Sequence, residues 1–144
     1  NGSHRARKSF HFFDGTIVCL GTDIENTNAE FPTETTVFQL AAITLENHQY
    51  WNNYKSDGRT YIDPNGVGYY LAKASVASAK YEKNFPQVTV GERSTKPTSG
   101  DWVSLTLQHG KAPKGASYEY AVLPRRNLLI KFFSKTVMRI SFVH

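Results

Sequence analysis

Turn signals recur at short intervals along this chain, and they constrain its fold more than any other feature. The dipeptide Asp14-Gly15 follows an aromatic-rich run and precedes an apolar run at residues 16–20. Asp-Gly is typical of two-residue hairpin turns, because it tolerates the positive φ angles that these turns need. Further turn signals stand at residues 57–58 and 63–66. Turns at such close spacing indicate short strands rather than long helices.

The segments between these turns are rich in β-branched and aromatic residues, which favour strands. Residues 71–83 contain several Ala and Lys residues, but they lack a helix cap, so the sequence supports a helix there only weakly. We therefore predict an all-β fold, an antiparallel β-sandwich, with exposed loops at residues 91–100 and 109–116. The predicted strands cover residues 9–14, 16–20, 33–42, 67–72, 87–90, 102–108 and 117–123.

The chain has 144 residues, which suits one domain spanning residues 1–144. Residues 1–4 could be a remnant of cloning. Residues 125–144 form an atypical basic tail without acidic residues, and their β-branched and aromatic content favours strands over a membrane-binding amphipathic segment. Cys19 is the only cysteine, so no intrachain disulfide can form, and its apolar neighbours predict a buried side chain.

The formal net charge is +5, which favours a polyanionic partner such as nucleic acid, an anionic polysaccharide or a membrane surface. Nucleotide-binding and hydrolase motifs are absent, and the histidines have no partners at the spacing of metal ligands. Nucleic-acid-binding motifs are absent too, and no apolar run is long enough to span a membrane. We expect no metal, no cofactor, and neither a nucleic-acid nor a membrane partner.

Aromatic residues stand among polar and basic ones at several places in the chain, a composition that suits an acidic polysaccharide. The C–H faces of sugars pack on aromatic rings, while Lys and Arg bind carboxylate and sulfate groups. Many of these rings could instead fill the core of a small β-sandwich. The candidate charged contacts are Arg59, Lys73, Lys80 and Lys111, and the candidate aromatic platforms are Trp51, Tyr54, Tyr69 and Trp102.

One ordered set of motifs is more specific than composition. It comprises ARKSFHFFD at 6–14, IVCLG at 17–21, NT at 26–27, PTETTVFQ at 32–39, DPNGVGY at 63–69 and SYEYAVLP at 117–124. In this order and spacing, the set resembles the middle β domain of polysaccharide lyase family 8, above all the chondroitin ABC lyases. Hyaluronate and xanthan lyases are more distant relatives. The resemblance runs from about residue 5 to residue 124, and the basic tail does not match the family's continuation.

The resemblance implies a bacterial, secreted or periplasmic protein whose partner is a glycosaminoglycan. Enzymes of this family cleave uronic-acid polysaccharides by β-elimination, with Asn, His, Tyr and Arg from a helical domain that we do not find in this chain. We therefore expect no catalysis from the chain alone, since an acid and a base must lie within reach of the proton they move. In the chondroitin ABC type, one glutamate of the β domain supports the catalytic Arg and Tyr. Glu34 occupies that position, and it could equally be an ordinary exposed strand carboxylate.

Three functions are compatible with these features. The leading interpretation is a non-catalytic carbohydrate-binding module for acidic glycosaminoglycans such as chondroitin sulfate, dermatan sulfate and hyaluronan. The alternative is a structural fragment that completes a lyase active site only together with its helical domain. A third, nucleic-acid binding, rests on charge alone.

Overall fold

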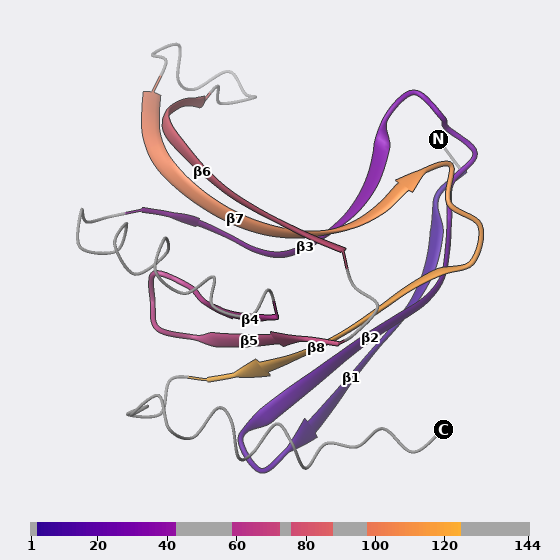
Figure 1. The fold of residues 1–144 in the computed structure, drawn as a ribbon, viewed down its shortest axis with the longest axis horizontal. Helices are drawn as coiled ribbons and strands as arrows, with labels where there is room; N and C mark the ends of the chain where they lie inside the picture. Colours follow the sequence, from indigo (N-terminus) through magenta and orange to yellow (C-terminus); the bar gives the residue numbers. More distant parts are fainter. Residues whose placement is uncertain (1–2, 43–58, 73–75, 88–97, 125–144) are drawn as a thin grey trace, which may run out of the picture.

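The computed structural model describes residues 3–42, 59–72, 76–87 and 98–124. Their regular elements are β-strands in two antiparallel sheets, which confirms the predicted all-β sandwich (Figure 1). A five-stranded sheet has the order β1-β2-β8-β5-β4, and a three-stranded sheet has the order β3-β7-β6. The strands are β1 Arg5–Phe13, β2 Thr16–Glu25, β3 Pro32–Ala41, β4 Thr60–Ile62, β5 Gly68–Leu71, β6 Val76–Gln87, β7 Thr98–Lys111 and β8 Ala116–Leu123. None of the described residues belongs to a helix long and apolar enough to cross a membrane.

Asp14 and Gly15 form the tip of the β1–β2 hairpin, as predicted. Their φ angles are 36° and 77°, so both central residues adopt the positive values of a type I′ turn. The register set by this turn holds along most of β1 and slips near its start, where Arg5 pairs with Glu25. Two residues of β2 oppose one of β1 there, which is a β-bulge, and Asp23 takes a φ of 52° within it.

The core lies between the two sheets and draws on both of them. Phe38 of β3 meets Tyr69 of β5 across the gap, with ring centroids 4.9 Å apart. Cys19 is 3% exposed, which confirms that it is a buried small hydrophobe. The buried cluster consists of Cys19, Ile24, Phe38, Tyr69, Leu71, Val103, Leu105, Leu107 and Tyr118.

A glycine lets the ring of Tyr118 lie flat on the five-stranded sheet. Gly21 on β2 pairs with Tyr118 on β8. A Cβ atom added at Gly21 would lie only 2.1 Å from the ring, closer than real Cβ contacts come. The missing side chain therefore provides the space that the ring occupies.

Two strands differ from the sequence prediction. β6 occupies much of the stretch that carried a weak helical signal, because it pairs with β7 along its length. β7 extends into both predicted loops, since it begins at Thr98 and ends at Lys111. The turn after it is confined to residues 112–115, where Ala112 and Gly115 have positive φ angles. β4 was not predicted, and residues 57–58 and 88–90 lie outside the described part of the chain.

Candidate functional site

The face of the three-stranded sheet that points away from the core is mostly polar. Its rows follow from the register: Gln39 and Lys80 flank Ser104, and Ala41 and Glu82 flank Trp102. Directly opposed residues project to the same side, and alternate residues of a strand share a face. We call this surface the polar face. It comprises Glu34, Thr36, Gln39, Ala41, Val76, Ser78, Lys80, Glu82, Trp102, Ser104, Thr106 and Gln108.

Two of the sequence-selected residues meet on the polar face as a cation and an aromatic ring. Lys80 is opposite Ser104, so Trp102 is its diagonal neighbour across the strand pair. The backbone positions of such diagonal neighbours lie about 7 Å apart. Lys80 is exposed and Trp102 is half-buried. The indole Nε1 is buried and has no hydrogen-bond partner among the described residues. This pair has the composition that a sugar acid needs, a charge beside a partly exposed ring.

Glu34 lies on the same face, near its other end. It is exposed, it stands opposite Gln108, and β7 separates its strand from the strand of Lys80. Its neighbour Thr35 points the other way, toward the core side, where it contacts His109. The structure therefore places Glu34 where its carboxylate can reach a molecule outside this domain.

The other predicted charged contacts lie elsewhere. Arg59 is exposed just before β4, at the edge of the other sheet, and its carbonyl accepts a hydrogen bond from the Leu71 amide at 2.8 Å. Lys111 is exposed at the end of β7. The remaining candidates, Trp51, Tyr54 and Lys73, lie outside the described residues.

Tyr69 is a core residue rather than a sugar platform. Its side chain is only 7% exposed, and its hydroxyl donates a hydrogen bond to Asp63 Oδ2 at 3.0 Å. Asp63 Oδ1 accepts bonds from the backbone amides of Asn65 at 2.8 Å and Val67 at 3.0 Å. Burial, followed by the negative charge of Asp63, raises the pKa of Tyr69 strongly. A ring enclosed in this way offers no face to a ligand, so the predicted platform at Tyr69 is wrong.

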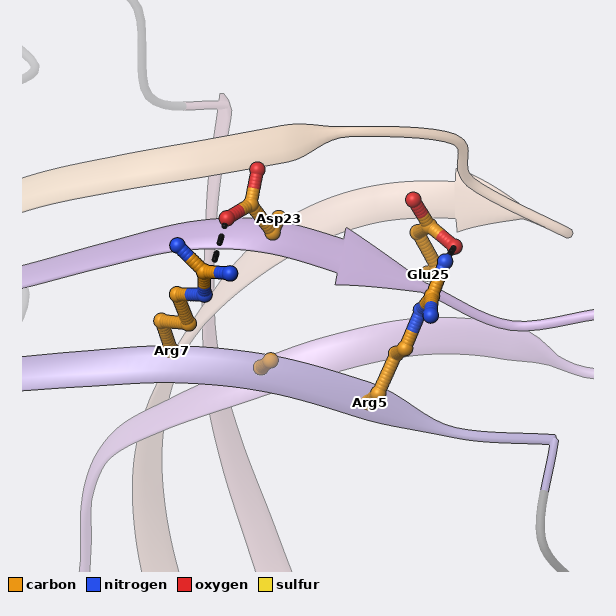
Figure 2. Close-up of a pocket in the computed structure, with 5 residues that line it drawn as sticks. Arg5, Arg7, Asp23 and Glu25 are labelled. Carbon is orange, nitrogen blue, oxygen red and sulfur yellow. Dashed lines mark hydrogen bonds and ion pairs between the residues drawn. The ribbon is translucent and has the colours of Figure 1, made fainter.

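Sequence reasoning missed a pocket on the β1–β2 hairpin (Figure 2). It has a volume of ≈ 430 Å³ and is lined by Arg5, Ala6, Arg7, Asp23 and Glu25. Arg5 Nη2 lies 2.6 Å from Glu25 Oε2, and Arg7 Nε lies 3.3 Å from Asp23 Oδ2. The two cations and two carboxylates balance in charge, and both pairs are exposed, so each contributes about 0–1 kcal/mol. The hairpin turn predicts the register of β1 and β2 and was the available sequence signal for this pocket. The bulge, however, decides which carboxylate each arginine meets.

His109, near the end of β7, has a shifted pKa. Its Nε2 lies 2.9 Å from Thr35 Oγ1, and its ring centroid lies 6.0 Å from that of Tyr118. Burial lowers its pKa, and the positive charges of His4 and Lys8 lower it further. Among the described residues, no group of three metal-ligating side chains comes together.

The model of the super-sandwich domain of polysaccharide lyase family 8 matches residues 1–128. The chain belongs to polysaccharide lyase family 8. One similar protein is the chondroitin sulfate ABC exolyase of Bacteroides thetaiotaomicron, 58% identical over 124 residues. Another is the chondroitin sulfate ABC exolyase of Proteus vulgaris, 36% identical over 129 residues. These matches cover 86% and 83% of this chain but only 12% and 13% of the two relatives.

A solved structure of chondroitinase AC lyase shares the fold of this family 8 chain. The TM-score is 0.62, and the match covers 92% of this chain and 21% of that one. At 23% sequence identity, this likeness concerns the fold alone. The resemblance found in the sequence motifs is thus confirmed, and the chain corresponds to the sandwich domain of the chondroitin lyases.

Proposed function

We propose that this chain binds an acidic glycosaminoglycan, such as chondroitin sulfate, dermatan sulfate or hyaluronan, and does not cleave it by itself. The observation that carries the proposal is the 58% identity to a protein named for its action on chondroitin sulfate. The net charge of +5 fits a polyanion of this class. Such polymers are extracellular, so the proposal places the protein in a secreted or periplasmic setting.

The polar face is the binding surface that we propose. Lys80 can form a charge-assisted hydrogen bond with a carboxylate or sulfate, and the exposed part of Trp102 can pack against the adjacent sugar ring. Ser104, opposite Lys80, and Gln39, on the other side of Ser104, supply further hydrogen-bonding groups in the row of Lys80. One shallow site of this size should bind with micromolar affinity, which corresponds to about 8 kcal/mol.

Titration calorimetry at about 150 mM salt tests binding, because surface charges are then screened beyond roughly 8 Å. We expect chondroitin sulfate to bind, and a neutral glucan and a DNA duplex to bind much more weakly. The variants Lys80→Gln and Trp102→Ala should each weaken binding of chondroitin sulfate. Lys114→Gln is the matched control, since it removes the same charge at an exposed site after β7. Failure of chondroitin sulfate, dermatan sulfate and hyaluronan to bind at millimolar concentration would refute the proposal.

The absence of cleavage is tested separately. Proton transfer needs an acid and a base within hydrogen-bond reach of the moving proton. On the polar face, the described ionisable groups are Glu34, Lys80 and Glu82, a set without His, Tyr or Arg. We expect no growth of unsaturated-uronate absorbance when the chain is incubated with chondroitin sulfate. Growth that a single substitution in this chain abolishes would contradict this part of the proposal.

A second candidate is a structural part of a lyase active site. It is favoured by the exposure of Glu34 and by the small share of the relatives that the chain covers. In this case the chain alone should bind neither chondroitin sulfate nor a neutral glucan. The same calorimetric series therefore separates the two candidates.

A further inference from the structure

Cations from both sheets gather at one end of the sandwich, on the core side and away from the polar face. Lys8 lies on β1 in the five-stranded sheet, and His109 lies near the end of β7 in the three-stranded sheet. The charges of Lys8 and of His4, which precedes β1, both act on the His109 ring.

The register fixes the direction of Lys8. Lys8 pairs with Gly21, and Gly21 pairs with Tyr118, so the side chains of Lys8 and Tyr118 project from the same face. Gly21 has no side chain between them, and the Tyr118 ring fills the space above it. His109 packs against that same ring at a centroid distance of 6.0 Å. Lys8, whose side chain is exposed, therefore projects from the sheet on the same side as the ring that His109 contacts.

No carboxylate balances these charges within the described part of the chain. The groups that act on His109 are His4 and Lys8, both cationic or able to become so. Tyr118 and Cys19, from β8 and β2, are neutral neighbours of the cluster. Arg7 and Asp23 form an ion pair with each other on the outside of the hairpin. Thr35 adds a hydroxyl from β3, 2.9 Å from His109 Nε2.

We propose that Lys8, His109 and Thr35 form a niche that binds an anionic group, the sulfate ester or the uronate carboxylate of a glycosaminoglycan. The identity of the anion rests on the proposed function, whereas the niche itself does not. An ammonium and an imidazolium donate charge-assisted hydrogen bonds, which are about twice as strong as neutral ones. A bound anion favours the protonated imidazole, so affinity for the anion rises as the pH falls.

Nuclear magnetic resonance of the His109 ring tests the niche with inorganic sulfate as the probe. Titrations in sodium sulfate and in sodium chloride are compared at equal ionic strength, and His109→Gln assigns the signal. We expect sulfate to raise the pKa of His109 by about 1. Lys8→Gln should raise the pKa in chloride, because a repelling charge is gone, and should abolish the response to sulfate. Arg7→Gln is the matched control, because it removes the same charge from the adjacent residue, which projects to the outer face. It should change neither the pKa of His109 in chloride nor the rise of that pKa in sulfate.

Two polymers then identify the anion. A rise in the pKa of His109 with chondroitin sulfate alone assigns the sulfate ester, and an equal rise with hyaluronan, which carries only carboxylates, assigns the uronate. The niche is refuted if inorganic sulfate leaves the pKa of His109 unchanged, or if Arg7→Gln acts like Lys8→Gln. Calorimetric binding of chondroitin sulfate without any response of His109 would refute the niche alone. A Lys8-dependent response to sulfate without polymer binding would instead refute the proposed function.

Discussion

The substitution Gly21→Ala tests the packing on which both sheets depend. The added Cβ would lie 2.1 Å from Cε1, 2.5 Å from Cζ and 2.7 Å from Cδ1 of Tyr118. These three atoms belong to one rigid ring, so the whole ring must move. Tyr118 is 4% exposed, and its ring contacts those of His109 and Tyr120 at centroid distances of 6.0 Å and 5.7 Å. Any movement of the ring therefore disturbs its neighbours.

Two effects of Gly21→Ala oppose each other in the free energy of unfolding. Replacing Gly by Ala restricts the unfolded chain, which stabilises the folded state by about 0.4–1 kcal/mol. Forcing an extra carbon into a packed core costs about 1–3 kcal/mol. Because the contact is far below van der Waals distance and the ring is enclosed, the second effect wins. We expect a net loss of about 2 kcal/mol, which lowers the melting temperature by about 8 °C.

Urea unfolding of matched variants measures this loss. Gly100→Ala is the control, because its added Cβ would meet Trp102 Nε1 at 3.6 Å, an ordinary contact, so it should keep the gain of about 0.4–1 kcal/mol and lose nothing to packing. In a Tyr118→Ala background the obstructing ring is absent, so Gly21→Ala should no longer destabilise. The reasoning is refuted if Gly21→Ala unfolds at the wild-type urea concentration, or if the loss is the same with and without the Tyr118 ring.

Three further predictions concern stability. Asp63→Ala removes the acceptor of three hydrogen bonds, so urea unfolding should show a loss of about 3 kcal/mol, against about 1 kcal/mol for Tyr69→Phe; equal losses would contradict this ranking. The folded state holds the pKa of His109 below 6.5, so the unfolded chain binds more protons and stability should fall as the pH drops below that value. Melting curves of His109→Gln should lack this part of the pH dependence, and an unchanged pH profile would exclude His109 as its source. Gly15→Ala places a side chain at a φ of 77°, and a loss of about 1 kcal/mol is expected, whereas an unchanged urea midpoint would argue against strain.

The hairpin shows how far local sequence determines this fold. Asp14-Gly15 specifies both the turn and the register that follows from it, so the pairing of β1 with β2 was within reach of the sequence. The bulge near Arg5 was not: the turn does not predict it, and the same segment of β2 also shifts its register against β8, between Gly21 and Ile24. One extra residue on β2 decides which carboxylate each arginine meets.

β6 and Tyr69 mark the limits of composition as evidence. Ala and Lys residues carried a weak helical signal in a segment that becomes an edge strand, because β7 offers a partner along its whole length. Local propensity is a weak prior, and tertiary pairing overrides it. Tyr69 was selected as an aromatic ring near polar residues, but the buried carboxylate of Asp63 holds its hydroxyl inside the sandwich. Such a partner becomes visible only when the turn at residues 63–66 is folded.

Both proposed surfaces follow from the period of two along a strand, which the sequence contains, and from the pairing of strands that are distant in the sequence, which it does not. Arg7 and Lys8 are adjacent and carry the same charge, yet they project to opposite faces: Asp23 pairs with Arg7 on the outer face, while Lys8 shares the face of Tyr118 and its charge acts on His109. On β3, Glu34 and Thr35 divide in the same way between the polar face and the core side. The net charge of the sequence counts Arg7 and Lys8 in the same way. What gives Lys8 the capacity to hold an anion is the absence of a described carboxylate beside it, and that absence is a property of strand pairing.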